Sequence, residues 1–246
     1  MELGNGDEQA QWKTWRQACL TLELEITDAQ QESFQRFYEL LITANRQLNL
    51  TRITALEDFL YRHLLDSLSL SAFLPMGSLL ADIGSGAGFP AIPLAMARPD
   101  LQVTAVESVG KKCAFIQETI EKLKLTNLKV LNTRGEQLGH DPQSRERFDR
   151  VTARAVAALP VLLEYCLPLV KVGGSFLAMK GLNFEAELAD SKNALHRLGG
   201  RLQEIKEFTH PDLSHLAGSR ILSIEKTGKT PATYPRHAGL IRKKPL

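Results

Sequence analysis

The glycine-rich stretch ADIGSGAGFP, residues 81–90, limits the fold of this chain more than any other feature. It follows a short apolar run and precedes an amphipathic segment, so we predict that it joins a strand to a helix. Glycines at positions 84, 86 and 88 allow a tight turn and leave backbone N–H groups bare where the helix begins. A ligand can lie against such a turn, and we expect a ligand site there.

The segments after Leu79 alternate between short apolar runs and amphipathic stretches. This alternation predicts an α/β fold with a mostly parallel sheet covered on both faces. The predicted strands carry LLADI, LQVTAVE, LKVLN, FDRVTARA and GGSFLAMK, and helices are expected to begin near Pro90, Lys111 and Leu159. Two further strands, 205–209 and 220–226, are joined by a loop alone, which predicts an antiparallel pair at one edge of the sheet.

The first 75 residues have a helical pattern and are predicted to form an extension of a domain at residues 76–246. Thr27 and Asp28 offer a helix cap. Thr54 and Glu57 have the spacing of a capping box, which would open a second helix that ends before Pro75. The aromatic residues of the first helical pattern are predicted to be core.

Charge is unevenly distributed along the chain. Residues 1–80 hold 11 acidic and 6 basic side chains, whereas residues 81–246 hold 17 and 24, although the net charge is only +2. The tail at 226–246 has six basic side chains and no acidic one. Lys and Arg bind phosphates without reading sequence, so the tail is a candidate RNA contact through Arg236, Arg242, Lys243 and Lys244. A solvated, disordered tail is the alternative.

Three features predict a soluble cytoplasmic protein without a metal centre. The first residues lack a basic segment followed by an apolar run, and no stretch approaches the roughly 18 apolar residues of a membrane span. The cysteines Cys19, Cys113 and Cys166 are far apart and form no C-x-x-C pair, which argues against disulfides and against a thiolate zinc site.

An acidic residue at the end of the second predicted strand indicates the class of ligand. Glu107 lies nineteen positions beyond Gly88, where a carboxylate can accept hydrogen bonds from both hydroxyls of a ribose. A dinucleotide fingerprint needs glycine at position 89, which is a phenylalanine here. The spacing 84, 86, 88 resembles the first motif of S-adenosylmethionine-dependent methyltransferases, and Asp82 would suit the ammonium group of that cofactor. Gly135 and Glu136, after the third strand, would meet its adenine ring or form only a solvated turn.

The end of the fourth predicted strand lacks the residues that amino-group methyltransferases use. It reads TARAV, without a proline pair or an aromatic clamp, and Cys166 does not follow a proline as the nucleophile of cytosine-C5 enzymes does. A ring nitrogen with a free lone pair, such as guanine N7, needs no base, so positioning and electrostatics suffice. Arg154 is our candidate catalytic residue, with a salt-bridge partner as the alternative. Lys180 is either a substrate contact or a solvated strand end.

These motifs together resemble the bacterial glucose-inhibited division protein B family of small-subunit ribosomal RNA guanine-N7 methyltransferases. The resemblance spans roughly residues 40–246 and rests on LLADIGSGAGFPAIPLA, ESxxKK, ARA, MKG, NLT, RHxxDS and the ending YPRxxG with KPL. It implies a monomeric cytoplasmic enzyme of the seven-stranded class I, Rossmann-like fold. Such an enzyme methylates N7 of one guanine in the decoding region of 16S rRNA, either free or in the precursor of the small ribosomal subunit.

The resemblance also implies roles for single residues. It places Gly84, Phe89, Gly135, Glu136 and Arg154 around S-adenosylmethionine, with Glu107 on the ribose. Our candidate cofactor-binding residues are therefore Asp82, Gly84, Gly86, Gly88, Phe89, Glu107, Ser108, Gly135, Glu136 and Arg154.

Two residues depart from the family pattern, and other functions stay open. Ala91 stands where Gly is frequent, and Ala153 stands where Ser is common. His63 and Asp66 are one helical turn apart and could pair with each other or help hold Asn49 and the cofactor face. We interpret them as making a structural interhelix hydrogen bond rather than forming a metal site. The alternatives are a methyltransferase acting on a protein or small molecule, a dinucleotide-dependent oxidoreductase, and a non-enzymatic binding module.

Overall fold

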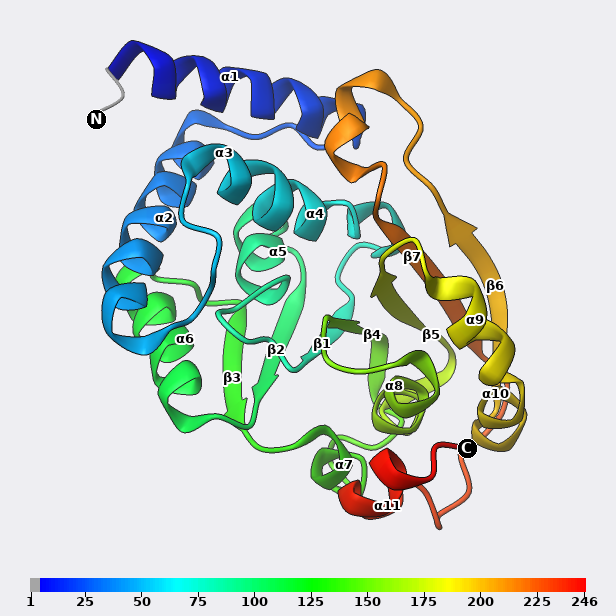
Figure 1. Ribbon diagram of the computed structural model, residues 1–246. Helices are drawn as coiled ribbons and strands as arrows, with labels where there is room; N and C mark the ends of the chain where they lie inside the picture. Colours follow the sequence, from blue (N-terminus) through cyan, green and yellow to red (C-terminus); the bar gives the residue numbers. More distant parts are fainter. Residues whose placement is uncertain (1–4) are drawn as a thin grey trace.

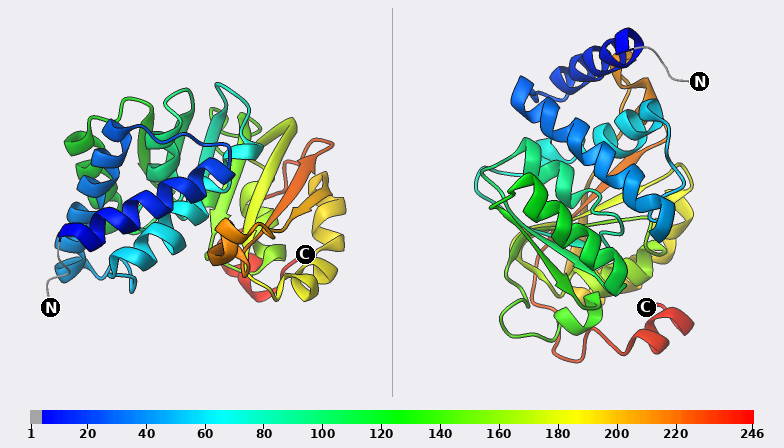
Figure 2. Two further views of the ribbon diagram at one scale, coloured as in Figure 1. Left: turned by 90° about the horizontal axis from the view of Figure 1, so that it is seen from above. Right: turned by 90° about the vertical axis from the view of Figure 1, so that its left-hand side faces the viewer.

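A seven-stranded sheet forms the centre of the computed structural model, which describes residues 5–246 (Figures 1 and 2). Its order is β3-β2-β1-β4-β5-β7-β6. Strands β1 to β5 are parallel, whereas β7 runs antiparallel to both β5 and β6. This confirms the predicted antiparallel pair at the edge, although β6 spans residues 200–206 rather than the predicted 205–209. The strands are β1 (Leu79–Ile83), β2 (Gln102–Glu107), β3 (Leu128–Asn132), β4 (Phe148–Arg154), β5 (Val170–Lys180), β6 (Gly200–Lys206) and β7 (Arg220–Lys226).

Helices cover both faces of the sheet because side chains of each strand alternate between two hydrophobic cores (Figure 1). Leu80 belongs to one core and Ala81 to the other. On the first face lie α5 (Ala91–Ala97) and α6 (Gly110–Leu123). The second face carries α7 (Gly135–Leu138), α8 (Leu159–Cys166), α9 (Phe184–Asp190), α10 (Lys192–Leu198) and α11 (Ala238–Lys243).

The N-terminal helices share the core of the first face with α5 and α6. Helices α1 (Asn5–Thr21) and α2 (Asp28–Leu48) precede a continuous helical stretch made of α3 (Leu56–Asp58), the π-helical segment η1 (Phe59–Leu65) and α4 (Asp66–Leu68). Two 3₁₀ turns, η2 (Ser71–Phe73) and η3 (Pro211–Leu216), complete the elements.

One of the two predicted helix caps is present. Thr27 caps α2 in a capping box with Gln30. The predicted cap at Thr54 is wrong: α3 begins at Leu56 without a side-chain cap, and the Thr54 carbonyl instead accepts a hydrogen bond from Tyr38 Oη at 2.8 Å.

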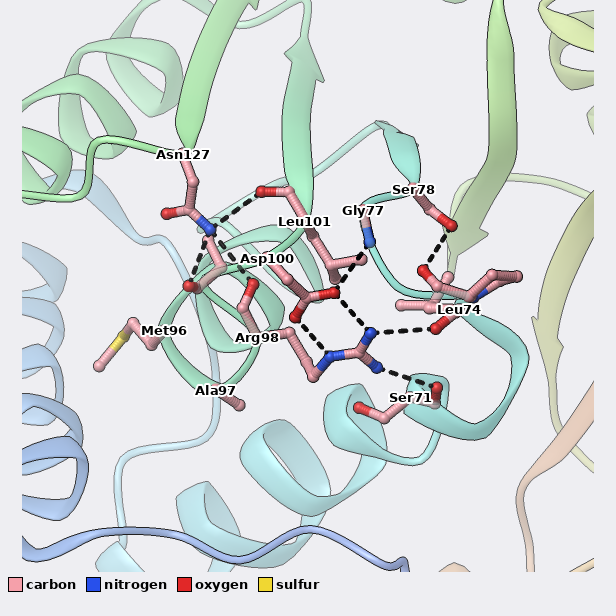
Figure 3. Close-up of polar contacts among 12 residues, drawn as sticks. Ser71, Leu74, Gly77, Ser78, Met96, Ala97, Arg98, Asp100, Leu101 and Asn127 are labelled. Atoms are coloured by element: carbon pink, nitrogen blue, oxygen red, sulfur yellow. Dashed lines mark hydrogen bonds and ion pairs between the residues drawn. The ribbon is translucent and has the colours of Figure 1, made fainter.

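A polar cluster fixes the amino-terminal ends of β1 and β2, opposite the glycine loop (Figure 3). Arg98 makes two 2.8 Å hydrogen bonds to the carboxylate of Asp100 and reaches the Leu74 carbonyl at 3.1 Å. The same carboxylate accepts from the Gly77 N–H. These contacts tie the segment leaving α4 to the sheet.

Within residues 5–246, no helix is both long and apolar enough to cross a membrane.

Candidate cofactor and acceptor site

The predicted site residues gather at the carboxyl edge of the parallel strands. From β1 the chain proceeds outward to β2 and β3 and then returns to β4 on the other side of β1, which creates a crevice between the ends of β1 and β4. The glycine loop follows β1, and Glu107 ends β2. Arg154 and Lys180 end β4 and β5.

The glycine loop forms a tight turn between β1 and α5. Gly84 has φ +76°, and a Cβ atom there would lie 2.6 Å from Cγ2 of Val156, which packs over the loop. Gly86 has φ +59° with no neighbouring side chain within 4 Å, so one side of the loop is open. The N–H groups of Gly84 and Ser85 donate to the Val106 carbonyl, which fixes the loop to β2.

Glu107 is bound to this loop. One carboxylate oxygen accepts from the Gly86 N–H at 2.9 Å and the other from the Val109 N–H at 2.7 Å. The side chain is buried, while the neighbouring Ser108 is exposed. Each carboxylate oxygen keeps a second lone pair, so Glu107 can still accept hydrogen bonds from a ribose.

The start of α7 is held close to the end of β1. A Cβ atom at Gly135 would lie 2.9 Å from Cγ2 of Ile83, so only glycine permits this approach. Glu136 is half-buried beside it. Gly135 and Glu136 are therefore brought to the same edge as the glycine loop.

Asp82 is a buried carboxylate without a partner. Its side chain has no exposed surface, and neither oxygen has a hydrogen-bond partner among the described residues. The nearby Ser85 hydroxyl donates to the Asp82 backbone carbonyl. Burial raises the pKa of Asp82 to about 7, against the opposing effects of Ser85 and Arg154. The charge of this carboxylate would attract a cationic group bound at the crevice, such as the ammonium group of S-adenosylmethionine, although Asp82 itself has no exposed surface.

Arg154 is held by the N-terminal helices. Its Nη1 donates to Asp66 Oδ2 at 3.0 Å and to the Arg62 carbonyl at 3.1 Å, and its Nη2 donates to His63 Nδ1 at 3.2 Å. The side chains of His63 and Asp66 each bind Arg154 and make no hydrogen bond to each other among the described residues, so they form structural hydrogen bonds between elements, as predicted, but do not pair.

The bond from Arg154 fixes the tautomer of His63. A guanidinium only donates hydrogen bonds, so Nδ1 must carry a lone pair and the ring proton is on Nε2. Nε2 then donates to Thr51 Oγ1 at 3.0 Å. Burial, with Arg154 and Arg62 nearby, lowers the pKa of His63 to about 3, so the ring stays neutral.

The side chain of Phe89 faces the N-terminal helices. It is buried, stacks on His63 with ring centroids 4.2 Å apart, and contacts Phe37. Cζ of Arg154 lies 5.4 Å from the centre of the Phe89 ring. Phe89 therefore contributes its backbone to the crevice, while its side chain supports His63 and Arg154.

Two of the six basic side chains of the tail have partners inside the fold. Arg236, predicted to bind RNA, instead donates to both carboxylate oxygens of Glu164 at 2.8 and 2.7 Å, and Glu164 is fully buried. Lys226 is also fully buried and contacts the Leu167 carbonyl and Glu146. Arg242, Lys243 and Lys244 are exposed on and after α11. The tail is thus packed, which excludes the disordered alternative.

Among residues 5–246 there is no group of three or more His, Cys, Asp or Glu side chains placed to hold a metal ion.

Comparison with known proteins gives the family. A family model described as rRNA small subunit methyltransferase G (GidB) matches residues 30–216. Ribosomal RNA small subunit methyltransferase G of Desulfitobacterium hafniense is 45% identical over 226 residues, covering 92% of this chain and 93% of that protein. The protein of the same name from Trichormus variabilis is 42% identical over 239 residues, covering 94% and 96%. The chain belongs to the rRNA small subunit methyltransferase G family.

This membership confirms the resemblance to the glucose-inhibited division protein B family. Solved structures show the likeness of fold alone: a crystal structure of a mutant of MtNAS has a TM-score of 0.54 and 14% identity, and covers 81% of this chain and 75% of that chain. The seven-stranded sheet of this chain agrees with the predicted Rossmann-like fold.

Two acidic residues were not identified from the sequence: one lies beside this site and the other beside the basic tail. Glu187, on α9, binds Lys180 at 2.6 Å, and Glu164, on α8, binds Arg236. Both lie within helical patterns where a carboxylate usually faces solvent, so no local signal marks them. Only the folded chain shows their partners.

Proposed function

We propose that this protein transfers the methyl group of S-adenosylmethionine to N7 of a guanine in the 16S rRNA of the small ribosomal subunit. The observation that carries the proposal is the buried, unpartnered carboxylate of Asp82 below an open glycine loop, with the held guanidinium of Arg154 across the crevice. Family membership supports a ribosomal RNA substrate.

The residues around the crevice fit the cofactor. Asp82 would attract its ammonium group from beneath the glycine loop. Glu107 would bind its ribose, and Gly135 with Glu136 its adenine ring. The loop at 84–89 passes along it, and Ser108 lies beside Glu107. When bound, the cofactor supplies a methyl group made electrophilic by a sulfonium. A dinucleotide is disfavoured because position 89 is not glycine.

The acceptor atom is inferred from the groups that contact Arg154, none of which is a free base among the described residues. Two groups that could act as a base contact Arg154, and both are occupied. Arg154 takes the Nδ1 lone pair of His63, whose pKa is lowered to about 3, and the two oxygens of Asp66 accept from Arg154 and from Ser219. An acceptor that must lose a proton would need a base here, whereas guanine N7 needs none. Arg154 therefore acts by position and charge in an enzyme that we place in the cytoplasm as a monomer.

Labelled S-adenosylmethionine incubated with naked 16S rRNA, small subunits or whole ribosomes tests the proposal. We expect label in one of these, released by cleavage at 7-methylguanine. Label in another base, in protein or in none of the three would contradict it.

A further inference from the structure

A cavity of about 550 Å³ lies beside Arg154, between the ends of β4 and β5 and the loop that leads into β7. Its size falls within the usual range for small-molecule sites, about 300 to 1,000 Å³. Six charged side chains line it: Arg62, Asp66, Arg154, Lys180, Glu187 and Arg220. Because Arg154 is also at the cofactor crevice, a group bound in the cavity would lie next to the cofactor.

Most of these charges already have partners. Asp66 accepts from Arg154 with one oxygen and from the Ser219 hydroxyl, at 2.9 Å, with the other. Arg220 donates to Glu207 and to the Ala217 and Ser219 carbonyls. These side chains form the walls of the cavity rather than free binding groups.

Lys180 and Glu187 keep unused hydrogen-bonding groups. Lys180 Nζ donates to the Ala157 carbonyl at 2.9 Å and to Glu187 Oε2 at 2.6 Å, so one of its three N–H bonds is free. Oε2 also accepts from the Leu159 N–H at 2.6 Å, whereas Oε1 has no partner among the described residues. The Glu187 side chain is one-third exposed and the Lys180 side chain nearly buried, at 33% and 10%. The pair thus presents an acceptor beside a donor.

We propose that Glu187 and Lys180 recognise the Watson–Crick edge of the target guanine, an inference that rests on the function proposed above. Glu187 Oε1 accepts from N1–H and from the N2 amino group, and Lys180 Nζ donates to O6. Adenine would turn the lone pair of its N1 toward the carboxylate, so the same pair rejects it.

The contact to Glu187 strengthens during the reaction. The N7 lone pair forms a bond to the methyl carbon while the carbon–sulfur bond breaks and its electron pair goes to sulfur. Positive charge passes from sulfur into the purine, and no proton leaves. N1–H and the N2 amino group become stronger donors as this charge develops, so the carboxylate stabilises the transition state more than the bound substrate.

The rim of the cavity suits a nucleotide taken out of its stack. Arg62 is exposed and has only a 3.5 Å contact to Asp58, which leaves it free for a phosphate. Val156 and Leu182, next to lining residues 155 and 181, are apolar and yet exposed at 39% and 58%. Apolar side chains of this kind contact the faces of flipped bases.

A double-mutant cycle between enzyme and substrate tests the proposal. The enzyme change is Glu187→Gln, which keeps acceptors for Lys180 and Leu159 but removes the charge. The substrate change is inosine at the mapped target position of 16S rRNA, which removes only the N2 amino group. Glu185→Gln, an exposed carboxylate on the same helix, is the matched control. Cofactor binding and thermal melting show whether each variant is folded.

We expect E187Q to lower kcat/KM on guanine about 10- to 100-fold, the size for a hydrogen bond to a charged group, with part of the loss in kcat. Inosine should cost the parent enzyme about tenfold and E187Q much less, because the partner is already gone. Equal costs in both enzymes, or a parent that methylates inosine as fast as guanine, would overturn the assignment. The inosine arm needs only the parent enzyme, so it holds even where E187Q does not fold. A parent that fails to methylate guanine refutes the proposed function instead.

Discussion

Replacing Arg236 with methionine separates a structural role from an RNA-binding role. Glu164 has no exposed surface and accepts three hydrogen bonds from Arg236, through its backbone N–H, Nε and Nη2. Removing one partner of a buried ion pair costs about 3 to 5 kcal/mol. The Arg236 side chain is 20% exposed, so water reaches the pair and we expect the lower figure, about 3 kcal/mol. For a chain of this length that corresponds to a fall in melting temperature of roughly 6 to 12 °C.

Lys243→Met is the matched comparison, because Lys243 is an exposed cation on the same tail. Thermal melting, and RNA binding measured between 50 and 300 mM salt, should show opposite effects for the two variants. R236M lowers the melting temperature and leaves the slope of log K against log salt unchanged. K243M leaves the melting temperature unchanged and reduces that slope by about 0.7 to 0.9, the loss of one phosphate contact. An R236M protein that melts like the parent but loses that slope would refute the structural assignment.

Three further substitutions test the crevice. Burial raises the pKa of Asp82 from 3.8 to about 7, so its stabilising contribution is present below pH 4 and is lost as the pH rises through 7. D82N should therefore have a higher melting temperature than the parent at pH 8 and the same one at pH 4. As Asp82 ionises between pH 5.5 and 7, the affinity of the parent for the cofactor should rise roughly tenfold, and calorimetry should show no such rise for D82N. H63F keeps a ring against Phe89 but removes the hydrogen bonds to Thr51 and Arg154. It should slow methyl transfer about 10- to 100-fold in single-turnover assays. H215F is the control, because that ring stacks on Tyr61 instead, and it should leave the rate unchanged. G84A introduces a Cβ at φ +76° against Val156, and should lose about 1 to 3 kcal/mol in denaturant unfolding, only part of which G84A/V156A restores.

The edge of the sheet that holds the site follows from the order of strands and helices. Parallel strands end at one edge, so residues that directly follow or end them must meet there. This places Gly84, Glu107, Gly135, Arg154 and Lys180 together without knowledge of a single contact. The sequence could also place the helix cap at Thr27, whose partner Gln30 is three residues away.

Contacts between distant residues were outside the reach of the sequence. Thr54 has the spacing of a cap, but α3 begins at Leu56, and Thr54 contacts Tyr38 on α2 through its carbonyl. His63 was visible as a motif, yet its link from Thr51 to Arg154 depends on how η1 packs against β4. Local patterns report the hydrogen bonds that a segment makes within itself, and these residues bind other segments.

The basic tail shows why a count of charges overstates affinity for RNA. Of its six cations, Lys226 and Arg236 are neutralised by Glu146 and Glu164 within the fold, and the other four are exposed. At about 0.9 per phosphate contact, these four can supply a salt slope of at most about 3.6. Truncating the tail would remove the partner of a buried carboxylate together with these charges, and the resulting loss of fold would be mistaken for loss of RNA contacts. Single neutral substitutions at the exposed positions measure the contribution of the tail without that confusion.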